Sequence, residues 1–189
     1  MAQLNSEKLK PYAPLFLALA TLGLLLSLPI HILSFFDIPA MERWPVVSVL
    51  HIGVLIVFGL AISLNQKEKD GRSDQDLDDE FKHAPRWLNG LTGLFTVSAV
   101  IHFAICFASG TPEHLKDGTY ALMNHGKLIR AITEQEFHQF NARSSGMFSG
   151  FWLIFYSQAM VMITHAIKRD KALGDELANS TESKSDKED

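Results

Sequence analysis

The chain has 189 residues, a hydrophobic fraction of 47% and a formal net charge of −4. This length suits one domain, and for a chain with this charge we expect no nucleic-acid partner. The single cysteine, Cys106, cannot form a disulfide within the chain, so nothing in the fold depends on an oxidising compartment.

The apolar residues gather in four blocks that contain no Lys, Arg, Asp or Glu. A helix needs about 20 apolar residues to cross the hydrocarbon core of a membrane, and each block is long enough. Lipid offers no partner to backbone polar groups, so each block should be helical. A soluble bundle is the alternative, but soluble helices carry a polar stripe that these blocks lack. We therefore predict an all-α membrane protein with four transmembrane helices, at about residues 13–36, 45–64, 87–109 and 146–167.

Lys and Arg near the ends of the spans predict their orientation, because the cytoplasmic side carries the excess of these residues. We therefore place both termini in the cytoplasm of a bacterium, the four spans in its inner membrane, and residues 111–145 outside the cytoplasm. The cytoplasmic residues are Lys8, Lys10, Lys67, Lys69, Arg72, Lys82, Arg86, Lys168, Arg169 and Lys171, and the outer ones are Arg43, Lys116, Lys127, Arg130 and Arg143.

The outer segment 111–145 contains the signals of a small β-hairpin followed by a helix. Asn124-His125-Gly126 stands between apolar stretches, and Asn124 and Gly126 are expected to supply the positive φ angles of a tight turn. Thr133 followed three residues later by Glu136 is a capping box, so a helix should begin there.

The chain should form a single four-helix transmembrane domain over residues 1–171, with the outer hairpin and helix as an insert. The polar tail 172–189 is rich in Lys, Asp, Glu and Ser, and we expect it to be disordered. Small residues predict where helices approach closely. Gly53 and Gly59 lie in the second span, and Gly146 and Gly150 form a Gly-x-x-x-Gly pair at the start of the fourth.

Each predicted span contains one histidine. From their distances to the span ends, at about 1.5 Å per residue, His31, His51 and His102 share one depth, roughly 9–12 Å inside the outer boundary. His165 lies near the cytoplasmic end and belongs to another layer. Cys106 follows His102 by one helical turn.

Four interpretations of this histidine layer remain open. The imidazoles could hydrogen-bond across helices and hold the bundle together. His31, His51 and His102, with Cys106, could bind a transition metal. Two of the histidines could be the axial ligands of a b-type haem, or the layer could have a proton-linked role, since ionisable residues in membranes are usually functional.

The sequence contains two further patterns. Residues 21–31 align without gaps with residues 92–102, where Thr, Ser, Ile and His coincide, as a duplicated hairpin would predict. The outer segment adds His114, His125 and His138, for which we weigh surface positions against a surface metal site.

The pattern G-T-Y-A-L-M-N-H-G-K-L-I-R-A-I-T-E-Q-E-F, followed by M-F-S-G-F-W-L-I-F-Y, resembles a group of small uncharacterised bacterial inner-membrane proteins with four spans. Pro85-Arg86-Trp87 before the third span is similar too, so the resemblance covers roughly residues 85–156. The group has histidine where this chain has Phe151, so no ligand role carries over to that position. The resemblance implies the same architecture and no established activity.

No Ser/His/Asp arrangement, phosphate-binding glycine loop or pair of catalytic carboxylates is visible, so we expect no catalytic activity. The expected function is that of an integral membrane protein that acts through contacts of its helices or outer hairpin with a partner. That partner would be a second copy of the chain or another membrane protein, within the lipid bilayer. The alternative is a haem- or metal-binding membrane protein that uses the histidine layer.

Overall fold

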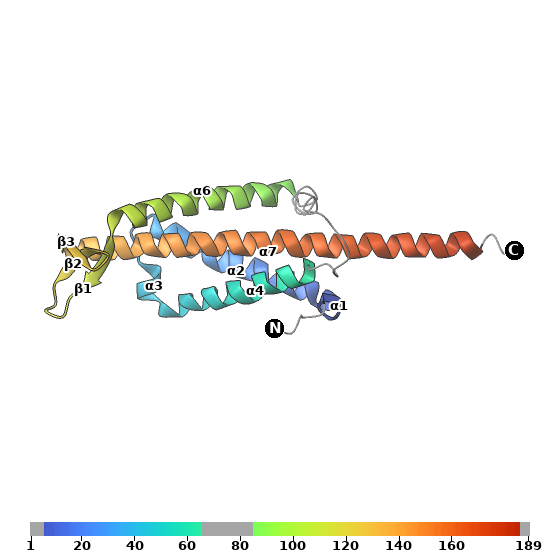
Figure 1. Ribbon diagram of the computed structural model, residues 1–189, viewed down its shortest axis with the longest axis horizontal. Helices are drawn as coiled ribbons and strands as arrows, with labels where there is room; N and C mark the ends of the chain where they lie inside the picture. Colours follow the sequence, from blue (N-terminus) through green and yellow to red (C-terminus); the bar gives the residue numbers. More distant parts are fainter. Residues whose placement is uncertain (1–5, 66–84, 186–189) are drawn as a thin grey trace.

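The computed structural model of the chain describes residues 6–65 and 85–185. The long helices run along one axis, and a small sheet caps one end of the bundle, which we call the sheet end (Figure 1). The elements in chain order are α1 (Ser6–Leu9), η1 (Lys10–Tyr12), α2 (Ala13–Ser34), α3 (Ala40–Arg43), η2 (Pro45–Ser48), α4 (Val49–Asn65), α6 (Arg86–Ser109), β1 (Thr111–His114), β2 (Tyr120–Asn124), β3 (Lys127–Ile132) and α7 (Glu134–Ser185).

Within the described residues, four helices are long and apolar enough to cross a membrane, which confirms the predicted number. Pro11, Pro45 and Pro85 stand at the starts of the first three, where a missing N–H costs no helical hydrogen bond. The candidate spans are Lys10–Ser34, Pro45–Asn65, Arg86–Ser109 and Glu134–Ala172.

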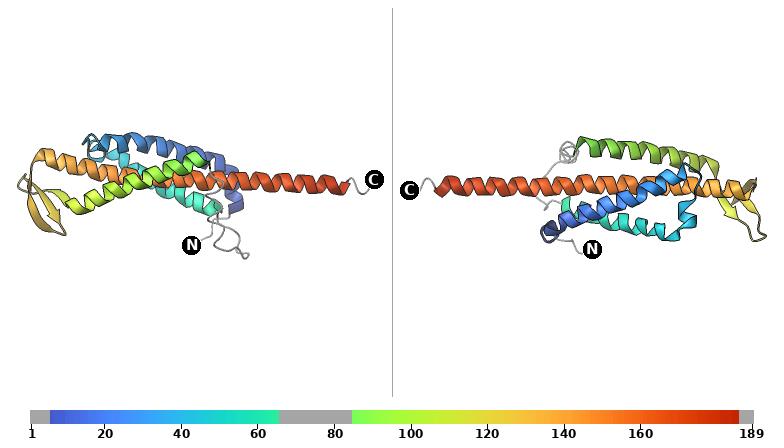
Figure 2. Two further views of the ribbon diagram at one scale, coloured as in Figure 1. Left: turned by 90° about the horizontal axis from the view of Figure 1, so that it is seen from above. Right: turned by 180° about the vertical axis from the view of Figure 1, so that it is seen from behind.

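Helix α7 is the element against which the other three spanning helices pack. All three pack along α7, and α2 crosses α7 obliquely, so that it lies beside α6 at the sheet end and approaches α4 farther along the bundle (Figures 1 and 2). Most of the apolar part of α7 is buried, whereas most residues of α2, α4 and α6 are at least partly exposed. The exposed residues are large and apolar, for example Leu55 and Phe107, which is the surface that lipid requires.

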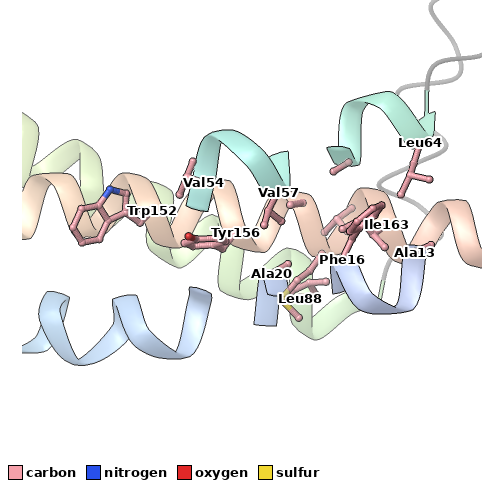
Figure 3. Close-up of a cluster of buried hydrophobic side chains, with 14 of the residues drawn as sticks. Ala13, Phe16, Ala20, Val54, Val57, Leu64, Leu88, Trp152, Tyr156 and Ile163 are labelled. Carbon is pink, nitrogen blue, oxygen red and sulfur yellow. The ribbon is translucent and has the colours of Figure 1, made fainter. Parts of the chain in front are cut away.

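Tyr156 of α7 fills the space where α2 and α4 approach that helix (Figure 3). Its ring lies against Gly23, its hydroxyl lies against Gly53, and the hydroxyl donates a hydrogen bond of 3.1 Å to the Leu50 carbonyl. A Cβ atom on either glycine would overlap the tyrosine. Gly53 therefore allows the close approach that the sequence predicted, but Gly59 does not, because a Cβ there would meet nothing within 4 Å.

The sheet-end segment folds as an antiparallel sheet, with the order β1-β2-β3 in the described part of the chain. The predicted hairpin is confirmed, although the turn sits one residue later than expected. Asn124 is the last residue of β2 and pairs with Lys127, and the positive φ angles belong to His125 (49°) and Gly126 (76°). Two consecutive positive φ angles define the tight turn whose twist matches that of paired strands.

Strand β1 was not predicted from the sequence. It pairs with β2, so that Thr111 lies opposite Met123, and its Pro112 is tolerated because β1 is an edge strand. In the β1–β2 connection, Asp117 accepts hydrogen bonds from the Thr119 hydroxyl (2.7 Å) and backbone N–H (3.0 Å). These two bonds hold the pKa of the Asp117 carboxyl below its usual value.

The start of α7 is the capping box that the sequence predicted. The Glu136 N–H donates to the Thr133 hydroxyl (3.2 Å), and the Thr133 N–H donates to the Glu136 carboxylate (2.9 Å). Arg130 of β3 donates to the same carboxylate at 2.8 Å. The cap thus ties the last strand of the sheet to the first turn of the central helix.

The predicted disordered tail 172–189 overlaps the far end of α7, and its residues 186–189 lie outside the described part of the chain, so its disorder stays a prediction. The helix continues to Ser185. The chain contains no proline after residue 167 to stop it.

Replacing Gly23 by alanine should destabilise the bundle, because the new Cβ would overlap the Tyr156 ring and push α2 away from α7. Such overpacking costs about 1–3 kcal/mol. Denaturant titration of the purified protein in detergent measures the change. Gly59→Ala is the matched control, since it makes the same chemical change where the space is open. Equal stability of the two variants would contradict this account of the packing.

Candidate functional site

His31 of α2 connects three helices near the sheet end. Its Nδ1 lies 3.1 Å from the Gly146 carbonyl oxygen and 3.1 Å from the Ser149 hydroxyl, both of α7, and its Nε2 lies 2.8 Å from the Ser98 hydroxyl of α6. A carbonyl oxygen only accepts, so the neutral ring carries its proton on Nδ1, and the Ser98 hydroxyl donates to Nε2. One buried imidazole therefore joins α2, α6 and α7.

His102 of α6 lies beside it. The two ring centroids are 5.0 Å apart, and the ring of Phe35 packs edge-on against both, at 5.3 Å from His31 and 4.9 Å from His102. His102 Nδ1 donates to the Ser98 carbonyl, one turn back in its own helix, at 3.0 Å. Both histidines are buried, with exposed fractions of 5% and 7%. The sequence prediction that His31 and His102 share a depth thus corresponds to direct contact.

The predicted Gly146–Gly150 pair lies at this junction and allows it to form. A Cβ on Gly146 would lie 2.5 Å from the Ser34 hydroxyl oxygen and 2.6 Å from Cδ2 of His102. A Cβ on Gly150 would lie 3.0 Å from that of Ala99. The α7 backbone can therefore reach the histidines only where it carries no side chain.

His51, the third member of the predicted layer, lies elsewhere. Its ring packs against Phe148 at 5.2 Å and Trp152 at 4.7 Å, and its Nδ1 donates to the Ser48 carbonyl at 3.3 Å. Residues 146 and 148 of one helix point about 200° apart at 100° per residue, so His51 lies on the opposite side of α7 from His31.

Cys106 borders a different feature of the sheet end. It helps to line a cavity of about 210 Å³ between the last turn of α6 and the β2–β3 turn, together with Phe107, Gly110, Thr111, Asn124 and His125. Among the residues that the structure describes, no group of three or more His, Cys, Asp or Glu side chains is placed to hold a metal. The predicted set of His31, His51, His102 and Cys106 is therefore not brought together as one coordination site.

The contacts of the histidine pair fit hydrogen bonding better than ligation. Both nitrogens of His31 already have partners on α6 and α7. A haem iron between the rings would lie about 2 Å from one nitrogen of each, with the macrocycle between them. Gly146 fills the space beside His102, so α7 would have to move away. Metal or haem binding by this pair stays a prediction.

A second cluster of polar side chains, separate from the histidine pair, lies at the exposed surface of the sheet end. Glu42 of α3 accepts a hydrogen bond of 2.8 Å from Asn141, and its carboxylate lies 3.1 Å from Nδ1 of His138, both of α7. These contacts fasten the α2–α4 connection to α7. Beside them is an open hollow of about 490 Å³, lined by Asp37, Glu134, Gln135, His138 and Gln139.

The outer histidines do not gather into one site. His114 stacks on Tyr120 of the sheet at 4.9 Å, His125 lies in the β2–β3 turn, and His138 contacts Glu42. Each of the three has its own local environment, which agrees with separate surface positions better than with a shared metal site.

Sequence reasoning missed the serines around His31 and the hollow beside Glu42. The serines could have been suspected, because Ser34, Ser98 and Ser149 each lie within a turn or two of a histidine or of the Gly146–Gly150 pair. The hollow leaves no such signal, since it forms between segments far apart in the chain. In comparisons with protein-family models, curated proteins and solved structures, none matches this chain.

Replacing Gly146 by alanine should separate α7 from the histidine pair, because the new Cβ would overlap the Ser34 hydroxyl and the His102 ring. We expect a loss of about 1–3 kcal/mol of stability in detergent, as for other overpacked sites. Gly93→Ala, in α6, is the control because a Cβ there meets nothing within 4 Å. If Gly146→Ala were as stable as Gly93→Ala, the junction would be looser than described.

Proposed function

We propose that this protein is a multi-pass protein of the bacterial inner membrane that catalyses no reaction and binds a protein partner outside the cytoplasm. Both termini lie in the cytoplasm, and the sheet end lies on the other side. The apolar lengths of the four spanning helices support the membrane. The bias of Lys and Arg toward the ends away from the sheet supports the orientation.

The hollow beside Glu42 is the observation that supports a protein partner. It opens at the sheet end, and each residue that lines it has a polar or charged side chain. Pockets for small molecules are mostly lined by apolar and aromatic side chains, so this lining suits a polar segment of another protein. Asp37 and Glu134 line it, and Glu42 stands next to it, so the segment should carry Lys or Arg.

The surroundings of the hollow suit a binding surface that keeps its shape. Glu42 holds the α2–α4 connection against α7 through His138 and Asn141. The capping box fixes the start of α7, and four of the five lining residues come from the first two turns of this helix. Fixed surfaces lose little conformational entropy on binding, which favours affinity.

Reporter fusions test the orientation. A reporter that is active only in the cytoplasm should be active when it is fused after Lys168. The same reporter should be inactive when it is inserted at Gly118, where the chain turns and has open space around it. A reporter that works only outside the cytoplasm should give the opposite pattern at both positions. Activity of the cytoplasmic reporter at Gly118 and not after Lys168 would overturn the proposed orientation.

Site-specific cross-linking in cells tests the partner. A photoreactive phenylalanine derivative in place of the exposed Gln135 should yield an adduct with another protein. Removing two charges, by Asp37→Asn and Glu134→Gln together, should lower its yield roughly tenfold, since exposed charge pairs contribute up to about 1 kcal/mol each. Asparagine suits the positive φ of Asp37 (56°).

The matched control removes two charges elsewhere at the sheet end, by Glu113→Gln and Asp117→Asn, and should leave the yield unchanged. An adduct that survives in the first variant, or falls equally in the control, would contradict the hollow as the binding site. The captured protein could be a second copy of the chain. That result would agree with the proposal only if the adduct yield falls when Asp37 and Glu134 lose their charges.

A further inference from the structure

We propose that the tip of the β2–β3 hairpin lies in the membrane surface, with Leu128 and Ile129 among the lipid headgroups and upper acyl chains. The partner on this face is phospholipid. The inference concerns a different face from the hollow and does not depend on which side of the membrane the sheet end occupies.

The register of the sheet places the hairpin tip at the level of the membrane boundary. Helix α6 ends at Ser109, and β1 begins two residues later. Thr111 pairs with Met123, and Met123 pairs with Leu128. The turn beyond these pairs must therefore point back toward the bundle. The cavity of about 210 Å³ shows the same arrangement, because turn residues Asn124 and His125 line it together with Cys106 and Phe107 of the last turn of α6.

Two neighbouring apolar residues at this tip are exposed. Leu128 has an exposed fraction of 64% and Ile129 of 51%. In a regular strand, adjacent side chains point to opposite faces, so one of the two would turn toward the sheet interior. Here a β-bulge leaves Ile129 without a partner opposite Met123 and Leu122, and bulges re-aim side chains in this way.

The exposed residues continue the apolar surface of α6. The Ile129 side chain lies against Gly110, whose added Cβ would be 2.9 Å from Cδ1 of Ile129. Phe107, one turn earlier, is 76% exposed, and Phe103 is 48% exposed and stacks on it at 6.0 Å. If α6 spans the membrane, this surface faces lipid, and Ile129 of β3 adjoins it at Gly110.

The charge beside the tip suits a phospholipid surface. Lys127 is exposed and directly precedes Leu128. A lysine at this depth can extend its long side chain to the phosphate while its neighbours remain among the acyl chains. A free edge strand with two exposed apolar residues would invite pairing with other chains in water, and contact with lipid would cover those side chains.

The test uses the full-length protein in vesicles of phosphatidylethanolamine and phosphatidylglycerol. A photoreactive phenylalanine derivative at position 128 should give a product heavier by one phospholipid, as should the same residue at position 107. At position 117, in the β1–β2 connection, it should give none. Absence of a lipid adduct at position 128, or an adduct with a second copy or another protein, would overturn the proposal.

Because an apolar label could itself seek lipid, a second measurement leaves the chain unchanged. Hydroxyl radicals generated in water oxidise accessible side chains. Leu115, in the β1–β2 connection, is less exposed than Leu128 in the protein itself. In vesicles, Leu128 and Ile129 should nevertheless be oxidised severalfold less than Leu115. If Leu128 were instead oxidised more than Leu115, as its greater exposure in the protein alone would give, the hairpin tip would lie in water and the proposal would be wrong.

Discussion

The fold depends on the close approach of three helices to α7 without the hydrophobic effect that drives such packing in water. Lipid tails are as apolar as leucine side chains, so a span gains nothing by exchanging lipid for another apolar helix. The helices must gain dispersion contacts and hydrogen bonds instead, which requires their backbones to come near each other. Gly23 and Gly53 accept the Tyr156 ring and hydroxyl, and Gly146 accepts the His102 ring.

The polar groups inside the bundle follow from the same constraint. Ser27 donates to the Gly23 carbonyl and Thr92 donates to the Leu88 carbonyl, each within its own helix, so neither leaves an unsatisfied donor in an apolar environment. His31 is different, because its partners lie on two other helices. It therefore supplies contacts that fix how α2, α6 and α7 are rotated relative to one another.

The sheet end has two unlike faces. Toward the α2–α4 connection it presents carboxylates, a histidine and amides around an open hollow. Toward the end of α6 it presents Leu128 and Ile129 beside Phe107. The Arg130–Glu136 ion pair joins β3 to the start of α7, so the two faces belong to one fixed unit. Seating one face in lipid would hold the other at a set height above the membrane, which links the two proposals physically.

The sequence by itself determined what depends on local composition: the four spans, the hairpin and the capping box at Thr133. A span is a matter of length and apolarity, and a turn or cap involves only a few neighbouring residues, so these features could be predicted without knowledge of packing. It also predicted one depth for His31, His51 and His102, because the fixed rise per residue of a helix converts the number of residues from the span end into a distance along the helix axis.

Only the tertiary structure decided which histidines meet. The rotation of each helix about its axis depends on side chains from other helices, so His31 and His102 came together while His51 turned to the far side of α7. Strand β1 is a second case, because Thr111–His114 has no strand-like pattern and is extended only because β2 supplies its hydrogen bonds. The hollow beside Glu42 likewise exists only once α3 has been fastened to α7.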